Sequence, residues 1–213
     1  TSLTALGVLT ASLAGHAQVV SESFMNSSFD ETGWVVAGNT YTPNLTSGGV
    51  DSVGDGWLRL TSTGGDQATS AYLDTSFSAA GATVYASFEY ATWGGNGADG
   101  MTFFLFDGST SFAVGAPGGS LGYANRNAEV GMVGGYIGVG IDEYGNFSSS
   151  SEGKTGGLSS GLTPDAIAVR GSAASGYEFL GSSGTLATSI DTPSVGTRPT
   201  ITNQVQILLT ATN

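Results

Sequence analysis

Glycine is the feature that most constrains what this chain can fold into. Of its 213 residues, 35 are glycine, more than twice the usual share of about 7%. The glycines follow no three-residue period, which excludes a collagen helix. Hydrophobic residues still make up 39% of the chain and aromatic residues 10%, which is enough for a packed core. Glycine, serine, threonine and aromatic residues in this combination are typical of short strands joined by many turns.

Charge and cysteine content exclude several classes of partner and site. Seventeen acidic residues face five basic ones, giving a net charge of -12. The basic residues are scattered singly, so the sequence offers no basic patch to nucleic acid or to an anionic membrane surface. The absence of cysteine excludes disulfides, thiolate zinc sites and cysteine nucleophiles. An acid-rich chain suits calcium, or simply stays soluble.

The N-terminus has the pattern of a signal peptide. A short apolar run over residues 3–14 is followed by Gly-His-Ala and then by the polar Gln18. Signal peptidase cleaves after a short apolar core that ends in small-x-Ala, and this run is too short to span a bilayer. We therefore expect residues 1–17 to be a signal peptide with a clipped start, and the protein to be secreted or at the cell surface. A first strand or a disordered tail is the alternative.

The only histidine, His16, lies in this segment and would be removed with it. A mature chain without histidine or cysteine cannot carry out Ser-His-Asp or Cys-His chemistry. It also offers no imidazole ligand to zinc.

Apolar runs of strand length predict the fold class. After residue 20 no long stretch has the 3.6-residue period of a helix, and Gly/Asn/Ser/Asp clusters separate the runs. The predicted strands are residues 84–91, 101–106, 136–144, 166–169 and 205–209. Together they indicate an all-β, antiparallel sandwich of two packed sheets. Residues 204–213 look like a strand inside a sheet, and a final strand in that place would leave an open sheet edge. A cut C-terminus is therefore an alternative that we keep.

One predicted strand leads into a candidate calcium site. Its apolar residues share one face, so Gly138, Gly140 and Asp142 share the other, which the glycines leave open to a ligand or another backbone. Just beyond, Asp142, the Tyr144 carbonyl and Asn146 can converge on one point. Carboxylate, carbonyl and amide oxygens are the hard ligands that calcium takes.

Two later acidic residues, Glu152 in the following loop and Asp165 before the next strand, could complete the calcium shell. The alternative is an Asp/Asn-rich turn that holds no ion.

Two further clusters could face a ligand. Asp99 lies between Ala98 and Gly100 directly before a buried strand, either as a turn residue or as a carboxylate aimed into a surface depression. The pair Gly118-Gly119 exposes backbone N–H groups that can donate to a ligand, unless it is a flexible loop.

Three ordered motifs together resemble the legume-type (L-type) lectin domain. Ala98-Asp99-Gly100, running into Phe-Phe-Leu at residues 103–105, resembles the family's Ala-Asp-Gly…Phe-Phe-Leu signature. Residues 118–122 resemble its Gly-Gly-x-Leu-Gly loop, and residues 141–146 its Phe-Asp-x-aromatic-x-Asn motif. Three motifs in the right order are more specific than any one of them. The glycine-rich, cysteine-free style resembles the bacterial members.

The resemblance also covers the early strands, at residues 57–61 and 68–74. It implies a concanavalin-like jelly roll over residues 18–213, with a concave antiparallel sheet that binds sugar packed on a flatter sheet. It implies that Asp142, the Tyr144 carbonyl and Asn146 hold calcium. The family's later loop aspartate has no clean counterpart here, so we expect Asp165, and next Glu152, in its place.

For the sugar, the resemblance implies binding by Asp99, Gly119, Tyr144 and Asn146, with a cis peptide bond before Asp99. The motif asparagine presents its amide to sugar hydroxyls, the aspartate accepts two hydroxyls, the glycine donates an N–H group and the aromatic ring stacks on the sugar. Plant members carry a glutamate where this chain has Gly140, and a histidine after the loop, so a manganese site is not expected here.

The expected function is calcium-dependent, non-catalytic binding of glycans. One alternative is an adhesin module that calcium stiffens and that has no sugar site. Another is a glycoside hydrolase, which needs two carboxylates about 5–9.5 Å apart. On the predicted strand, Asp142 is flanked on its face by Gly140 and Tyr144, whereas Glu143 points to the opposite face, so that acid pair is missing. We therefore expect no enzymatic activity.

Overall fold

The computed structural model describes residues 18–79, 81–159, 161–192 and 195–210. The predicted signal peptide, with His16, lies outside the described residues. Within the described part of the chain there are ten strands and two 3-10 helices of three residues each, neither of them long or apolar enough to cross a membrane. The elements are β1 (Trp34–Gly38), β2 (Asn44–Leu45), β3 (Leu58–Arg59), β4 (Thr69–Leu73), β5 (Thr83–Tyr90), β6 (Gly100–Phe106), η1 (Gly118–Ser120), β7 (Gly135–Asp142), β8 (Ala166–Arg170), η2 (Ala173–Ser175), β9 (Phe179–Thr185) and β10 (Asn203–Thr210).

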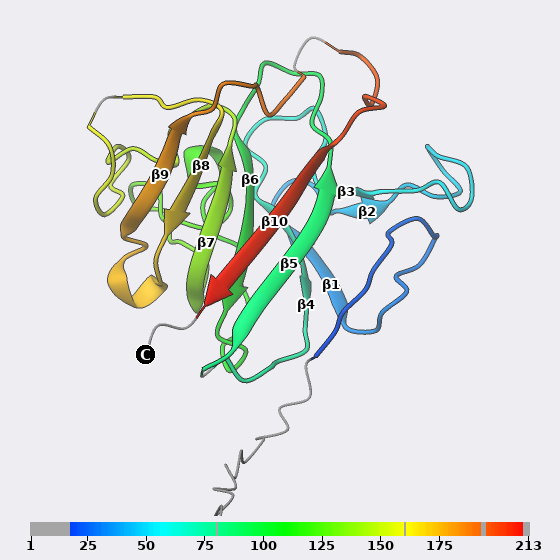
Figure 1. Cartoon of the computed structure of the whole chain (residues 1–213), viewed down its shortest axis with the longest axis horizontal. Helices are drawn as coiled ribbons and strands as arrows, with labels where there is room; N and C mark the ends of the chain where they lie inside the picture. The colour runs from blue at the N-terminus through cyan, green and yellow to red at the C-terminus, as the bar shows by residue number, and fades with distance from the viewer. Residues whose placement is uncertain (1–17, 80, 160, 193–194, 211–213) are drawn as a thin grey trace, which may run out of the picture.

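The strands form an antiparallel β-sandwich, as the sequence predicted. Four strands pair in the order β6-β7-β8-β9, and β5 pairs with β10 along its whole length. In Figure 1 the β5–β10 pair crosses in front of the four-stranded sheet. The remaining pairs are β1 with β4 and β2 with β3, and every ladder between the named strands is antiparallel.

All five strands predicted from their patterns are present, as are the two early strands that the resemblance covers (β3 and β4), and three strands were missed. The missed strands are β1, which pairs with β4, the two-residue β2, which pairs with β3, and β9, which pairs with β8. Strand β9 has the sequence FLGSSGT, whose glycines and serines have low strand propensity. It forms because β8 supplies a hydrogen-bonding edge, and its register shifts twice along that edge. The pairing is a tertiary effect that the local sequence does not indicate.

Alternation on β5 and β7 builds the core between the two layers. Tyr90 at the end of β5 packs with Ile141 of β7 and with Ile190, and Phe88 stacks on Phe103 with ring centroids 6.4 Å apart. Because side chains alternate across a strand, Ile141 enters this core while its neighbour Asp142 faces the other side of the sheet.

The second face of the four-stranded sheet is covered by loops and aromatic rings. A Cβ at Gly138 would come within 2.5 Å of the Tyr123 ring, and a Cβ at Gly140 would overlap the Phe147 ring. Both rings are fully buried. The glycines leave space on this face, but the Tyr123 and Phe147 rings fill that space. This part of the face, which we expected to be open to a ligand or another backbone, therefore belongs to the core.

Candidate functional site

Asp142, the last residue of β7, closes the turn that follows it. Its side chain is 0% exposed, and its two carboxylate oxygens accept hydrogen bonds from the backbone N–H groups of Gly145 and Phe147, each at 2.8 Å. Burial raises the pKa of Asp142 to about 6, and the backbone hydrogen bonds oppose that rise. The carboxylate therefore fixes the backbone that carries Tyr144 and Asn146.

Asp99 is tied to the same turn through its main chain. The carbonyl of Asp99 accepts hydrogen bonds from the N–H groups of Glu143, at 3.0 Å, and Tyr144, at 3.1 Å. The peptide bond between Ala98 and Asp99 is cis, as the resemblance implied. The half-buried carboxylate of Asp99 is left without a hydrogen-bond donor from the described residues, and burial raises its pKa. It is thus a free acceptor at the edge of β6.

Gly119 of η1 is packed against the side chain of Asn146. A Cβ at position 119 would overlap the side-chain amide of Asn146. The Oδ1 atom of Asn146 is buried and finds no hydrogen-bond partner within the described residues. An unpartnered amide oxygen beside a bare glycine backbone is a position where a bound group could supply the missing contact.

Three separate segments thus meet at one place. The residue before β6 (Asp99), the η1 turn (Gly119) and the turn after β7 (Tyr144 and Asn146) are brought together by the contacts just described. Tyr144 remains 42% exposed, so its ring is open to solvent beside these polar groups. We name these four residues the Asp99 cluster.

Charged side chains surround the Asp99 cluster, and the sequence did not indicate that most of them lie near Asp99. The charge of Glu152 raises the pKa of Asp99, whereas that of Arg126 lowers it. Both neighbouring bases are already paired: Arg126 Nε lies 2.6 Å from Glu129 Oε2, and Lys154 Nζ lies 2.5 Å from Glu152 Oε2. The sequence shows Arg126 and Lys154 as isolated bases, and only the fold brings them to Asp99.

The two acidic residues expected to complete a calcium shell both have partners of their own. Asp165 Oδ1 accepts hydrogen bonds from the Ser189 hydroxyl and from the Ile190 N–H group, each at 3.0 Å. Glu152 is engaged with Lys154. In the described ranges, no group of three or more acidic or histidine side chains converges closely enough to hold a metal ion.

The turn itself nevertheless fits a hard cation. Asp142 takes part in no salt bridge of the described residues, and Asn146 Oδ1 is buried without a partner. A buried carboxylate and an orphaned amide oxygen are the donor types that calcium prefers. Asp142 and Asn146 therefore supply donor types that fit calcium.

Glu143 forms a separate buried acidic site on the opposite face of the sheet. Burial raises its pKa to about 7, and the charges of Asp191 and Asp165 push the pKa in the same direction. Its Oε1 atom has no hydrogen-bond partner among the described residues. Because the residue is only 9% exposed, it cannot meet a glycan at the surface.

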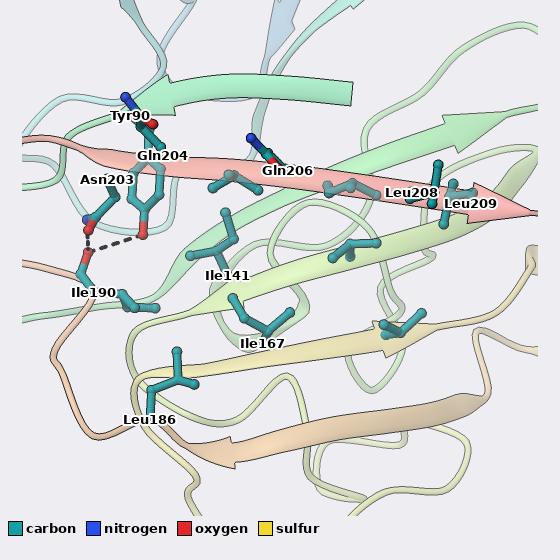
Figure 2. A pocket seen from close by; sticks show the side chains of 14 residues that line it. Tyr90, Ile141, Ile167, Leu186, Ile190, Asn203, Gln204, Gln206, Leu208 and Leu209 are labelled. Carbon is teal, nitrogen blue, oxygen red and sulfur yellow. Dashed lines mark hydrogen bonds between the residues drawn. The ribbon is translucent and has the colours of Figure 1, made fainter. Parts of the chain in front are cut away.

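A cavity of about 480 Å³ lies between β10 and the four-stranded sheet, on the Ile141 face. Its walls include Ile141, Ile167 and Leu186, which Figure 2 shows beneath β10. Two of its polar groups are satisfied internally, since Tyr90 and Asn203 both donate to the Ile190 carbonyl. Such an apolar space does not suit a sugar, and it lies on the other face of the sheet from Asp142.

Neither a scan against models of known protein families nor a search of curated proteins finds a match to this chain.

Proposed function

We propose that the protein is an L-type lectin-like, non-catalytic carbohydrate-binding domain that acts outside the cell, and that the Asp99 cluster is its sugar site. The observation that carries the proposal is the convergence of Asp99, Gly119, Tyr144 and Asn146 from three distant segments. These are the four residues that the family resemblance implies for sugar binding.

The chemistry of the cluster suits a saccharide. A sugar presents fixed pairs of hydroxyl groups and one face of C–H bonds. The free Asp99 carboxylate can accept hydroxyl hydrogen bonds, and the Asn146 amide and the backbone at Gly119 can complete the pattern. The exposed ring of Tyr144 offers a surface for the C–H face.

In this proposal, a calcium ion stabilises the sugar site. When bound, the ion would supply a fixed positive charge that compensates the buried Asp142 carboxylate and holds the 142–146 turn. Asp142, the Tyr144 carbonyl and Asn146 would be its protein ligands. Asn146 then links ion and sugar, because its side chain lies directly against Gly119.

The two other functions weighed for this chain have less support. A glycoside hydrolase needs a second accessible carboxylate beside the first. Asp142, at the end of β7, and Glu143, just after it, are both buried and face opposite sides of the sheet, which leaves the half-buried Asp99 as the acid of the cluster. A purely structural module would give no reason for an unpartnered Asn146 Oδ1 atom in the turn that the free Asp99 residue joins through its main chain.

The test is binding to a panel of immobilised glycans, in calcium and in EGTA. We expect wild-type protein to bind, and Asp99→Asn to lose binding at least about tenfold, since each charge-assisted hydrogen bond contributes about 1.5–3 kcal/mol. Asp74→Asn, which changes an exposed carboxylate outside the cluster, is the matched control. Equal binding by Asp99→Asn and wild type, with unchanged circular dichroism, would refute the site.

A further inference from the structure

Arg170, the last residue of β8, is a fully buried cation that the proposed sugar site does not use directly. Its side chain is 0% exposed, and no salt bridge of the described residues includes it. In the ladder between β7 and β8, Arg170 pairs with Gly138. Ala168, two residues earlier on β8, pairs with Gly140. Arg170 therefore lies on the same face of the sheet as Asp142.

The guanidinium is satisfied by backbone carbonyls alone. The five contacts are Nε to Phe147 at 2.8 Å, Nη1 to Tyr177 at 2.9 Å and to Thr155 at 3.2 Å, and Nη2 to Ser149 at 2.7 Å and to Gly156 at 3.4 Å. Arginine has five N–H donors in a rigid fork, so this set matches its full donor capacity. Burial lowers the pKa of Arg170 to about 10, which leaves the group charged at neutral pH.

The carbonyls belong almost entirely to one loop. Four of the five lie within residues 147–156, directly after Asn146, and the fifth is that of Tyr177. The guanidinium carbon also lies 5.5 Å from the centre of the Phe147 ring. If these hydrogen bonds to the carbonyls broke, the buried guanidinium would be left without any solvating group, at a large cost in free energy.

Phe147 connects this cation to the turn of the sugar site. Its N–H group donates to the Asp142 carboxylate and its carbonyl accepts from Arg170, both at 2.8 Å. The residue that follows Asn146 is therefore held at both ends of its backbone by buried, oppositely charged side chains. Any movement of the loop away from Arg170 would pull on Asn146.

We propose that Arg170 is a positioning residue, a covalently attached cation that orders the loop over residues 147–156 without a bound ion and so holds Asn146 in place for the sugar. The positioning role rests on the proposed function, whereas the ordering of the loop can be tested without any sugar. Calcium and Arg170 then act on adjacent segments: the ion on the 142–146 turn, and the guanidinium on the loop after it.

Trypsin cleavage at Lys154 measures how often this loop opens. Lys154 is the only lysine, and its side chain is 0% exposed, so trypsin can cut after it only when the loop opens. Trypsin cleavage of the folded protein at Lys154 should be slow for wild type in calcium and equally slow in EGTA. Arg170→Met should be cut at Lys154 at least about tenfold faster in both buffers, since cleavage tracks the population of the open loop.

Val169→Ala is the matched control. Val169 neighbours Arg170 on β8 but lines the apolar cavity on the opposite face, so its loss should lower the melting temperature without speeding cleavage at Lys154. Arg170→Lys keeps a positive charge with fewer N–H donors, so its rate of cleavage at Lys154 should lie between those of wild type and Arg170→Met. This variant still tests the inference if Arg170→Met does not fold. The glycan that wild type binds best on the panel should bind Arg170→Lys more weakly, and Val169→Ala as well as wild type.

Three outcomes would overturn the inference: rapid cleavage of wild type at Lys154 once EGTA is added, cleavage of Arg170→Lys no faster than wild type, or equal cleavage of Arg170→Met and Val169→Ala. Slow cleavage of wild type together with no binding to any glycan would refute the proposed function and the positioning role, while the ordering of the loop by Arg170 would stand.

Discussion

The side-chain amide of Asn146 rests directly on the backbone of Gly119, at a contact so close that no Cβ fits between them. The two residues are 27 positions apart in the sequence, and each belongs to a different turn. Their contact joins the η1 turn to the turn after β7, and with Asp99 it defines the place where we expect the sugar.

This contact predicts the effect of Gly119→Ala. The new methyl group must push the Asn146 amide away, so we expect loss of glycan binding by at least about tenfold, with far-ultraviolet circular dichroism unchanged. Gly181→Ala on β9 is the control, because a Cβ there meets nothing within 4 Å. Full binding by Gly119→Ala would show that the Asn146 position is not needed for the ligand.

A second substitution tests the packing behind the site. In Gly138→Ala the added Cβ falls within 2.5 Å of the fully buried Tyr123 ring. Overpacking of this kind costs about 1–3 kcal/mol, which lowers the melting temperature of a domain of this size by roughly 2–4 °C per kcal/mol. Calorimetry beside the same Gly181→Ala control measures the difference. A melting temperature equal to that of wild type would mean that Tyr123 can move aside freely.

The stability of the calcium-free protein should fall as pH rises from about 4.5 to about 7.5, because burial raises the pKa of Asp142 to about 6 and that of Glu143 to about 7. In that range the folded protein still holds protons that the unfolded chain has released, so deprotonation favours unfolding. We expect a higher melting temperature in EGTA at about pH 5 than at about pH 7.5.

The double variant Asp142→Asn, Glu143→Gln should flatten this pH dependence, since neither amide titrates. Acidic groups whose pKa is lowered, such as Asp51 beside Arg198, act in the opposite direction, but only at more acidic pH. A melting temperature that rises between pH 5 and 7.5 would contradict the assignment of buried, proton-binding carboxyls.

Calcium should stabilise the folded protein at neutral pH. An ion bound at Asp142 and Asn146 raises the free energy of unfolding by mass action, roughly 2.7 kcal/mol at 100 times Kd. Thermal melting in calcium against EGTA measures this, and Asp142→Asn should remove most of the shift. Asp165→Asn should keep the full shift, because Asp165 is engaged with Ser189 and Ile190. Superimposable wild-type curves with and without calcium would end the calcium proposal.

The charges around Asp99 predict a preference among glycans. Arg126 and Lys154 are paired with Glu129 and Glu152, so the described residues leave no unpaired base beside Asp99 for an anionic sugar. We expect uronic acids on the panel to bind more weakly than the matching neutral sugars. Glu129→Gln removes the nearer of the two acidic partners of Arg126, leaving Asp66 at 3.9 Å, and should narrow the difference in binding between uronic acids and neutral sugars. Stronger binding of uronic acids by wild type would contradict this prediction.

The sequence by itself determined the fold class and most of the central strands. Alternation in residues 84–91 and 136–144 and the apolar run of 101–106 are local patterns, and each strand appeared where its pattern lies. The same local reading located Asp99, Gly119 and Asn146 as candidates, because glycine pairs and Asp-x-Tyr-x-Asn spacing are visible in the chain.

Only the tertiary structure decided what those residues touch. The space beside Gly138 and Gly140 was visible in the sequence, but its occupation by Tyr123 and Phe147 was not. Likewise, nothing local marks Arg170 as the residue that donates to five carbonyls, or Asp165 as the acceptor for the Ser189 hydroxyl. Strand patterns depend on neighbours two residues away, whereas these contacts depend on close packing between segments that meet only once the sheets have formed.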